Sequence, residues 1–358
     1  MPLARLRRTL RRYARAAHTC AEGRPSRYPG VVLRMGAARW GDGLGPLPFS
    51  LFRLHRKPRA AWRDYVRDTP GNELYDAINP RAARAPLDDK LAFARACRDH
   101  GLATVPLLAI VHGPGSEGAG DVPALDSSAG IARLLAAHPQ GLFVKPVAGS
   151  HGEGAFRVLP AAHGCVLSGE GPAPLSRAWE RCAAGARAHA LLVQPRLVNA
   201  ASMRAWESTP GFSTVRAMTW RDGATPRLLA ACLRIATGDS VADNFLQGRA
   251  GNLVAPLEGA SGTIGPVRGS RSRDWPDIVE LPQHPAGGTR LPWWPELLDL
   301  VLRGQRAFAD LRLIGWDVGI TDEGPLLVEG NAAPDWDLPQ LAFDRGFRRD
   351  LALVLAAA

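Results

Sequence analysis

The amino-acid sequence predicts an α+β fold with antiparallel sheets. Two segments, 213–235 and 313–331, alternate apolar and polar residues on either side of a short turn, Asp222-Gly223 in the first and TDEG in the second, which is the pattern of a β-hairpin. Segments with helical spacing of apolar residues lie at 87–101, 128–138 and 293–311. This mixture of hairpins and helices is the basis of the prediction.

Size and composition indicate a globular protein. The chain has 358 residues, enough for two or three subdomains, and its 46% hydrophobic and 22% charged residues are ordinary for a soluble protein. No apolar stretch approaches the roughly 18 residues that a transmembrane helix needs. The five scattered cysteines form no CxxC motif or Cys/His cluster, which argues against disulfides and a zinc site and favours a reducing, cytoplasmic location.

The charge favours anionic partners. The formal net charge is +10, and among the 44 basic residues only Lys57, Lys90 and Lys145 are lysines. Nucleotides, phosphates, acidic substrates and membrane surfaces all suit such a charge. The arginines are spread along the whole chain, however, so a compositional bias explains them better, and we expect no specific nucleic acid partner.

The first 20 residues predict a basic amphipathic helix. Leu3, Leu6, Leu10 and Tyr13 follow one another at helical intervals with arginines between them. A terminal helix with a solvated basic face is the commoner origin of this pattern. Peripheral contact with a membrane, docking of an acidic partner, and an organellar transit peptide share the same features and stay open. The oligomeric state is not indicated.

Local signals predict the remaining elements. An Asp pair begins the helix at 87–101, and His100-Gly101 ends it. Strands are expected at 105–111 and at 190–195, where a proline stops the second, and a loop at 112–127. Residues 238–273 are Gly-rich and polar.

The stretch LFVKPVAGSHGEGAFRV, 142–158, predicts two strands joined by a glycine-rich loop. A P-loop would have its lysine after the glycines, and a dinucleotide-binding fingerprint would lead into a helix, so neither fits. Small residues let backbone N–H groups approach phosphate oxygens, and Lys145 at the strand end supplies a compact cation for them. A plain surface turn beside an ordinary lysine is the alternative.

The segment 314–340 predicts a metal site. Asp317 points away from the apolar face of its strand, and Glu329 and Asn331, two residues apart, share a face of the next strand. If Thr321 pairs with Pro325, Asp317 lies opposite Glu329, where the repulsion of two carboxylates is removed by Mg²⁺. A two-residue turn would put Asp317 opposite Gly330 instead and favour an ordinary polar face.

The hairpin at 213–235 carries one arginine on each arm, Arg216 and Arg234. Arginines on strands need solvent or an anionic partner, and a triphosphate or a charged substrate is such a partner. Solvation is the commoner explanation for a single arginine. Asp243 and Asn244, which follow the hairpin, are equally compatible with a plain turn.

Together these motifs resemble the ATP-grasp superfamily, and most closely its sugar-transfer-associated branch. The matching segments run in order over 87–345: DDKLAFARACRDHGL, FVKPVAGSHGEGAFRV, LLVQPRL, STVRAMTWRDG, LRIATGDSVADNFLQG and IGWDVGITDEGPLLVEGNAAPDWD. The resemblance implies two α+β subdomains that hold ATP between antiparallel sheets. The expected organisation is an N-terminal helical and loop lobe (1–86), an ATP-grasp domain (87–345) with a lid at about 140–195 and a catalytic part at about 196–345, and a C-terminal helix (346–358).

The resemblance also implies a role for each site residue. Nucleotide binding falls to Lys90, Lys145, Gly149, Ser150, Gly152, Gly154 and Gln194. One or two Mg²⁺ ions, or Mn²⁺, are assigned to Asp317, Glu329 and Asn331. Arg234 and Asn244 are expected to face the transferred phosphate or acyl phosphate, and Arg216 and Asp243 complete the expected catalytic residues. Two departures from the family pattern, QPRL at the adenine hinge and GRAGN after DN, leave the ribose partner and the substrate-side loop unassigned.

The implied activity is that of an ATP-dependent carboxylate–amine ligase. A carboxylate is phosphorylated by MgATP, and an amine, or less often another nucleophile, then displaces phosphate from the acyl phosphate. The family's association with polysaccharide genes suggests polysaccharide or secondary-metabolite synthesis. Two alternatives are an ATP-grasp phosphotransferase that acts on a hydroxyl, and a non-catalytic protein that binds nucleotides or polyanions.

Overall fold

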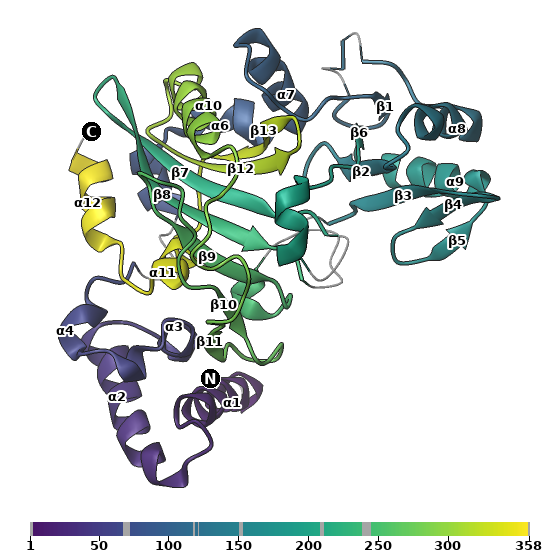
Figure 1. Cartoon of the computed structure of the whole chain (residues 1–358). Coiled ribbons are helices and arrows are strands. Elements are labelled where there is room, and N and C mark those ends of the chain that lie inside the picture. The colour runs from purple at the N-terminus through teal and green to yellow at the C-terminus, as the bar shows by residue number, and fades with distance from the viewer. Residues whose placement is uncertain are drawn as a thin grey trace.

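Two antiparallel sheets form the framework of the protein (Figure 1). The computed structural model describes residues 3–66, 72–116, 119–120, 122–149, 153–207, 211–237 and 245–356. The smaller sheet has the strand order β1-β6-β2-β3-β4-β5, and the larger sheet the order β11-β10-β9-β8-β7-β12-β13. Helices cover both sheets, so the predicted α+β class with antiparallel sheets is confirmed.

The strands of the smaller sheet are β1 (Ala109–Val111), β2 (Leu142–Pro146), β3 (Phe156–Ala161), β4 (Gly164–Leu167), β5 (Gly171–Ala173) and β6 (Leu191–Pro195). Those of the larger sheet are β7 (Thr214–Asp222), β8 (Thr225–Ile235), β9 (Leu253–Leu257), β10 (Arg268–Ser270), β11 (Ile278–Glu280), β12 (Leu313–Thr321) and β13 (Gly324–Asn331). The helices are α1 (Leu3–Cys20), α2 (Tyr28–Gly41), α3 (Pro46–Leu51), α4 (Arg59–Trp62), α5 (Asn72–Ile78), α6 (Arg81–Asp88), α7 (Lys90–Asp99), α8 (Ser128–Ala137), α9 (Leu175–Ala186), α10 (Trp294–Ala307), α11 (Asp337–Phe343) and α12 (Arg348–Ala356).

Each sheet has a face that is buried against helices. In the larger sheet, alternate residues of β12 point into a core shared with α6, α7 and α10, and Trp316 is fully buried there. A Cβ added at Gly304 of α10 would come within 3.1 Å of the Trp316 ring, so the helix packs closely on the strand. Helices α8 and α9 bury the smaller sheet in the same way. The opposite face of the larger sheet packs in part on α11 and α12, through Leu313 of β12 among others, and the part of it that carries Asp317 lines the site.

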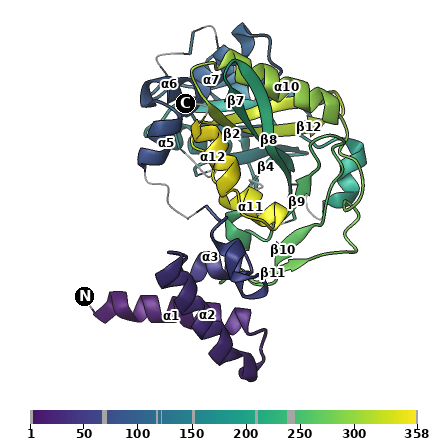
Figure 2. The same cartoon turned by 90° about the vertical axis from the view of Figure 1, so that its left-hand side faces the viewer.

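Helices α1 to α4 lie together at one end of the molecule (Figures 1 and 2). Their core contains Phe49, Phe52 and Trp62, and it packs against α11 and the edge of the larger sheet formed by β9 to β11. No helix in the described part of the chain is long and apolar enough to cross a membrane. The division of the chain at residues 86, 195 and 345 stays a prediction.

Most predicted elements are present, and the differences have local causes. The hairpins at 213–235 and 313–331 and the helices at 87–101 and 128–138 are confirmed within a few residues. The strand at 105–111 is reduced to β1, because Pro106 has no N–H for a ladder and Val105 instead donates to Leu327 O of β13. The helix at 293–311 begins only at Trp294, after Trp293 in a left-handed conformation, and ends at Ala307. Strands β9 and β10 lie in the Gly-rich stretch 238–273, for which no strand was predicted.

Asn79, directly after α5, ties the N-terminal part of the chain to the β12–β13 hairpin. Its buried side-chain amide donates to Leu313 O (2.7 Å) and Ala332 O (2.6 Å) and accepts from the N–H groups of Arg312 (2.7 Å) and Leu313 (3.2 Å). Replacing Asn79 with alanine leaves these backbone groups buried without partners, so we expect the free energy of unfolding to fall by about 3 kcal/mol. Urea denaturation measures this change.

The matched control for that prediction is Asp76→Ala, three residues earlier. Asp76 forms surface ion pairs with Arg81 and Arg84, and surface ion pairs contribute little to stability. Equal losses in the two variants would contradict the role assigned to the Asn79 amide.

Candidate active site

A cavity of about 590 Å³ lies between the two sheets and is lined by residues of both. From the side of the smaller sheet and α7, the predicted residues that line it are Lys90, Lys145, Gly149 and Gln194. From the larger sheet they are Arg216, Arg234, Asp317, Glu329 and Asn331. Gly154 lies next to lining residues without lining the cavity itself. Ser150, Gly152, Asp243 and Asn244 fall outside the described residues.

The register of β12 and β13 brings two carboxylates face to face. The hairpin turns through two residues, Asp322-Glu323, so the predicted three-residue loop is wrong. That turn alone would pair Asp317 with Val328, so the predicted pairing with Gly330 for a two-residue turn is wrong as well. A β-bulge leaves Val328 as an extra residue on β13, and Asp317 therefore lies opposite Glu329 after all, not opposite Gly330. Bulges of this kind commonly redirect a side chain next to an active site.

Asp317 is held by both arginines of the neighbouring hairpin. The Arg216 Nε atom donates to Asp317 Oδ1 at 2.6 Å, and Arg234 Nη2 lies 2.9 Å from Oδ2. The position of Arg216 follows from strand register, since it lies directly opposite Asp317 on β7. Solvation therefore does not explain these two arginines. Burial raises the pKa of the Asp317 carboxyl, but the two guanidinium groups outweigh that effect and hold the pKa below its ordinary value.

Lys145 is the buried cation of the smaller sheet. It lies on β2, with 9% of its surface exposed. Phe143, two residues earlier, points to the same face of the strand, and both side chains line the cavity. Burial lowers the pKa of Lys145 to about 8, and the negative charge of Glu329 offsets part of that effect. Glu329, on the facing sheet, is thus near enough to act on the lysine electrostatically.

The loop after β2 is anchored by glycine conformations and by Lys90. Gly149 has φ +117° and Gly154 has φ +72°, both in the region that favours glycine. A Cβ at Gly154 would also come within 3.1 Å of Pro146. Lys90 Nζ donates to Gly149 O at 2.7 Å, so this lysine holds the start of the loop. Gln194 of β6 is buried and donates to Val105 O at 3.4 Å.

A comparison with models of protein families identifies the family to which the chain belongs. The family model described as sugar-transfer associated ATP-grasp matches residues 71–355, which is most of the chain. The chain belongs to this family. The predicted resemblance is therefore confirmed, and the match begins upstream of the segment 87–345 on which the prediction depended.

Solved ATP-grasp structures are distant from this ATP-grasp protein. D-cycloserine synthetase DcsG has 14% identity over 78% of this chain and 72% of its own, with a TM-score of 0.45. The ligase PsnB complexed with minimal precursor has 14% identity over 78% and 64%, with a TM-score of 0.43. D-alanine-D-alanine ligase from Helicobacter pylori has 12% identity over 78% and 62%, with a TM-score of 0.40. The match thus spans less than two thirds of the last two chains, and no curated protein matches.

The donor set of this ATP-grasp protein fits Mg²⁺, the metal that the family generally uses. Mg²⁺ is usually held by one or two carboxylates together with substrate phosphates, and Asp317 and Glu329 face each other here. Asn331 adds an amide oxygen on the same strand, and this oxygen accepts a hydrogen bond from Ala333 N at 2.9 Å. Among the described residues no cluster of three His, Cys, Asp or Glu side chains suits a metal, so phosphates and water must complete the coordination.

Two lining arginines of the smaller sheet were not predicted. Arg157 of β3 lies opposite Phe143 of β2, and Arg196 directly follows β6. Burial lowers the pKa of both guanidinium groups. The sequence held a signal for Arg157. Phe143 shares a face of its strand with Lys145, and a residue opposite Phe143 on the partner strand must lie on that same face.

Proposed function

We propose that this ATP-grasp protein is an ATP-dependent carboxylate–amine ligase. The observation that supports it most is the convergence of Lys145, Asp317 and Glu329 on one cavity between two sheets. A triphosphate needs cations on one side and a carboxylate-bound divalent ion on the other, and the cavity offers both. The identity of the family supports ATP as the substrate.

The proposed reaction has two steps. An oxygen of the substrate carboxylate attacks the γ-phosphorus of ATP, the bond from that phosphorus to the β–γ bridging oxygen breaks, and ADP leaves. The nitrogen of an amine then attacks the carbonyl carbon of the acyl phosphate, inorganic phosphate leaves, and the nitrogen loses a proton. Both steps move negative charge between oxygens, so fixed cations lower their barriers.

The described side chains have distinct roles in this proposal. Lys145 binds the phosphates of ATP, and Lys90 positions the glycine loop through Gly149. Asp317, Glu329 and Asn331 would hold Mg²⁺, which neutralises charge on the phosphate oxygens when it is bound. Arg216 and Arg234, already in the cavity beside Asp317, supply the cations for the transferred phosphate.

Trapping with hydroxylamine tests the reaction class. We expect the protein, given MgATP, hydroxylamine and a pool of candidate carboxylic acids, to form a hydroxamate of one acid together with ADP, because hydroxylamine captures an acyl phosphate. Mass spectrometry identifies the hydroxamate, and omission of ATP is the control. ADP release with a phosphorylated hydroxyl product and no hydroxamate would establish the phosphotransferase instead. Nucleotide binding with no ADP release for any acid would favour a non-catalytic protein.

A further inference from the structure

Helix α1 is attached to the body by its C-terminal half alone. Ala16, Ala17 and Cys20 are buried, and Cys20 Sγ lies 3.6 Å from Ser50 Oγ of α3. The apolar stripe of the helix continues toward the N-terminus with Leu6 and Leu10, which are 46% and 59% exposed. Figure 2 shows this half of α1 running out from the molecule. The amphipathic pattern therefore extends beyond the surface that the body covers.

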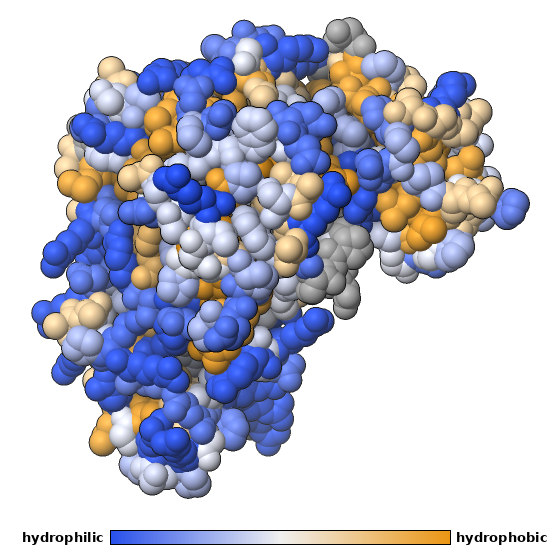
Figure 3. All heavy atoms as spheres, in the orientation of Figure 1, coloured by the Kyte–Doolittle hydropathy of each residue, from blue (hydrophilic) through white to orange (hydrophobic). Residues whose placement is uncertain are grey.

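Exposed apolar side chains concentrate on α1 and α2. Among the described residues, eight large hydrophobic side chains are exposed, and five of them belong to these two helices: Leu6, Leu10, Val32, Leu33 and Trp40. Leu33 is 76% and Trp40 87% exposed. Figure 3 shows orange residues among blue ones over this end of the molecule. Single exposed hydrophobics need no explanation, but Leu6 and Leu10 continue one stripe on one helix, and such a stripe needs an apolar partner.

The other sides of α1 are strongly basic. Residues 3–20 contain no acidic residue. Six arginines of the helix are exposed, and none forms an ion pair with a described residue: Arg5, Arg7, Arg8, Arg11, Arg12 and Arg15. At 100° per residue, they flank the Leu6–Leu10 stripe on both sides and fill the face behind it. Long arginine side chains beside an apolar stripe can reach lipid headgroups while the stripe enters the acyl boundary.

We infer that α1 binds the surface of a membrane that contains anionic lipids. Four to eight basic residues on an amphipathic helix suit such a surface, and α1 has six exposed arginines beside its apolar stripe. A nucleic acid would use the arginines and leave Leu6 and Leu10 in water. A second copy of the chain, docked through the leucines, would bring the arginines of both copies together, which repulsion opposes. Of these three occupants, the lipid surface is the one that takes up both the apolar and the basic face of the helix.

Cosedimentation of the full chain with lipid vesicles tests the inference. We expect binding to phosphatidylcholine vesicles that contain roughly one third phosphatidylglycerol, weaker binding as salt increases, and little binding to phosphatidylcholine alone. The variant R7Q/R8Q/R11Q should lower the partition coefficient about 100-fold, since each arginine near an anionic surface contributes about fivefold. The variant L6Q/L10Q should lower it roughly tenfold or more, through lost apolar burial.

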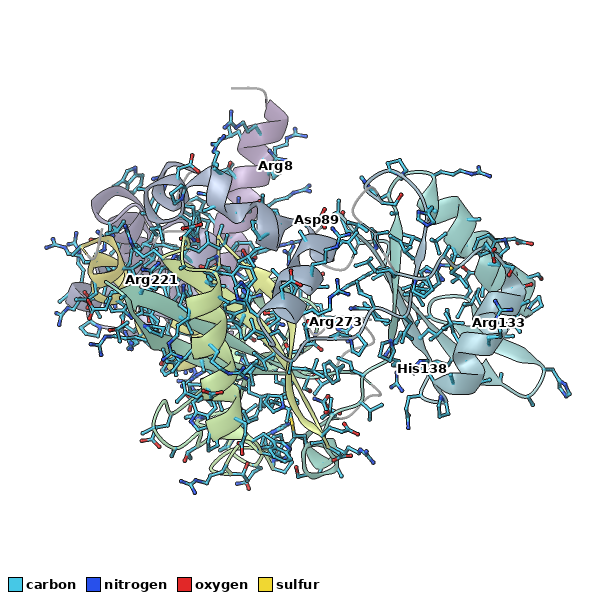
Figure 4. The ribbon with its side chains drawn as sticks, turned by 90° about the horizontal axis from the view of Figure 1, so that it is seen from above. Arg8, Asp89, Arg133, His138, Arg221 and Arg273 are labelled. Atoms are coloured by element: carbon cyan, nitrogen blue, oxygen red, sulfur yellow. The ribbon has the colours of Figure 1, made fainter. Side chains whose placement is uncertain are left out.

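The control variant is R133Q/R187Q/R290Q, which removes the same charge from exposed positions elsewhere. Arg133 on α8 lies far from Arg8 of α1 (Figure 4). This variant should bind vesicles like the unchanged protein. Because every changed side chain is exposed, all three variants should keep the melting temperature and the affinity for an ATP analogue.

Three outcomes would overturn the inference. The first is no binding of the unchanged protein to anionic vesicles at about 0.1 M salt. The second is an equal loss of vesicle binding in the control variant, which would show that binding depends on the net charge of the protein and not on α1. The third is tight binding of polyuridylate that the arginine variant abolishes and the leucine variant leaves unchanged, since the surface would then bind nucleic acid.

Discussion

Replacing Glu329 with glutamine is expected to remove the Mg²⁺-dependent part of ATP binding and to lower ADP release about 100-fold or more. The carboxylate of Asp317 is already shared by Arg216 and Arg234, whereas Glu329 forms no ion pair with any described residue. Glu329 is therefore the carboxylate most available to a cation. Titration calorimetry with a non-hydrolysable ATP analogue, in MgCl₂ and in EDTA, measures the Mg²⁺-dependent part without knowledge of the acid substrate.

The control for this prediction lies on the same hairpin. Glu323→Gln makes the same change of charge at the exposed turn, and it should leave both affinities unchanged. Asp317→Asn is a poorer probe, because it leaves two arginines in the cavity without their anion and should cost about 3–5 kcal/mol of stability. If Glu329→Gln binds the analogue as tightly in MgCl₂ as the unchanged protein does, the metal site is not where we propose it.

The sequence predicts those parts of the site that local signals determine. Turn residues and period-two alternation suffice for the two hairpins, and the capping Asp89 suffices for the start of α7. The pairing of Asp317 with Glu329 was predicted from a wrong turn, and the structure restores it through the bulge at Val328. Nothing in the residues around Val328 distinguishes a bulged strand from a regular one, so that step depends on packing with β12 and its neighbours.

Pairings between distant strands are the part that local patterns miss. The contact of Arg216 with Asp317 requires β7 to lie beside β12, and these strands are about a hundred positions apart in the chain. Strands β9 and β10 form in a Gly-rich stretch because β9 pairs with the edge of β8 and β10 in turn pairs with β9. Arg157, by contrast, lies on the predicted partner strand of β2, and its place in the cavity was missed although the alternation of Phe143 and Lys145 indicated it.

Replacing Lys145 with methionine is expected to change nucleotide affinity and folding stability in opposite directions. The ammonium group forms no hydrogen bond or ion pair with another residue in the part of the chain that the structure describes, and burial lowers its pKa to about 8. Loss of the charge-assisted hydrogen bonds to phosphate should weaken binding of the ATP analogue about 100-fold. Without nucleotide, methionine removes a buried charge while it keeps the apolar stem, so the free energy of unfolding should rise.

The opposite signs make this test stringent, because a variant that only disturbs the fold would lose both affinity and stability. Calorimetric titration and urea denaturation on the same sample measure the two changes. Arg133→Met removes one positive charge from an exposed position of α8 outside the cavity and should alter neither quantity. If Lys145→Met binds the analogue within about twofold of the unchanged protein, far less than the loss of one charged hydrogen bond would cause, the buried lysine does not contact the phosphates, and the site assigned to ATP must lie elsewhere in the cavity.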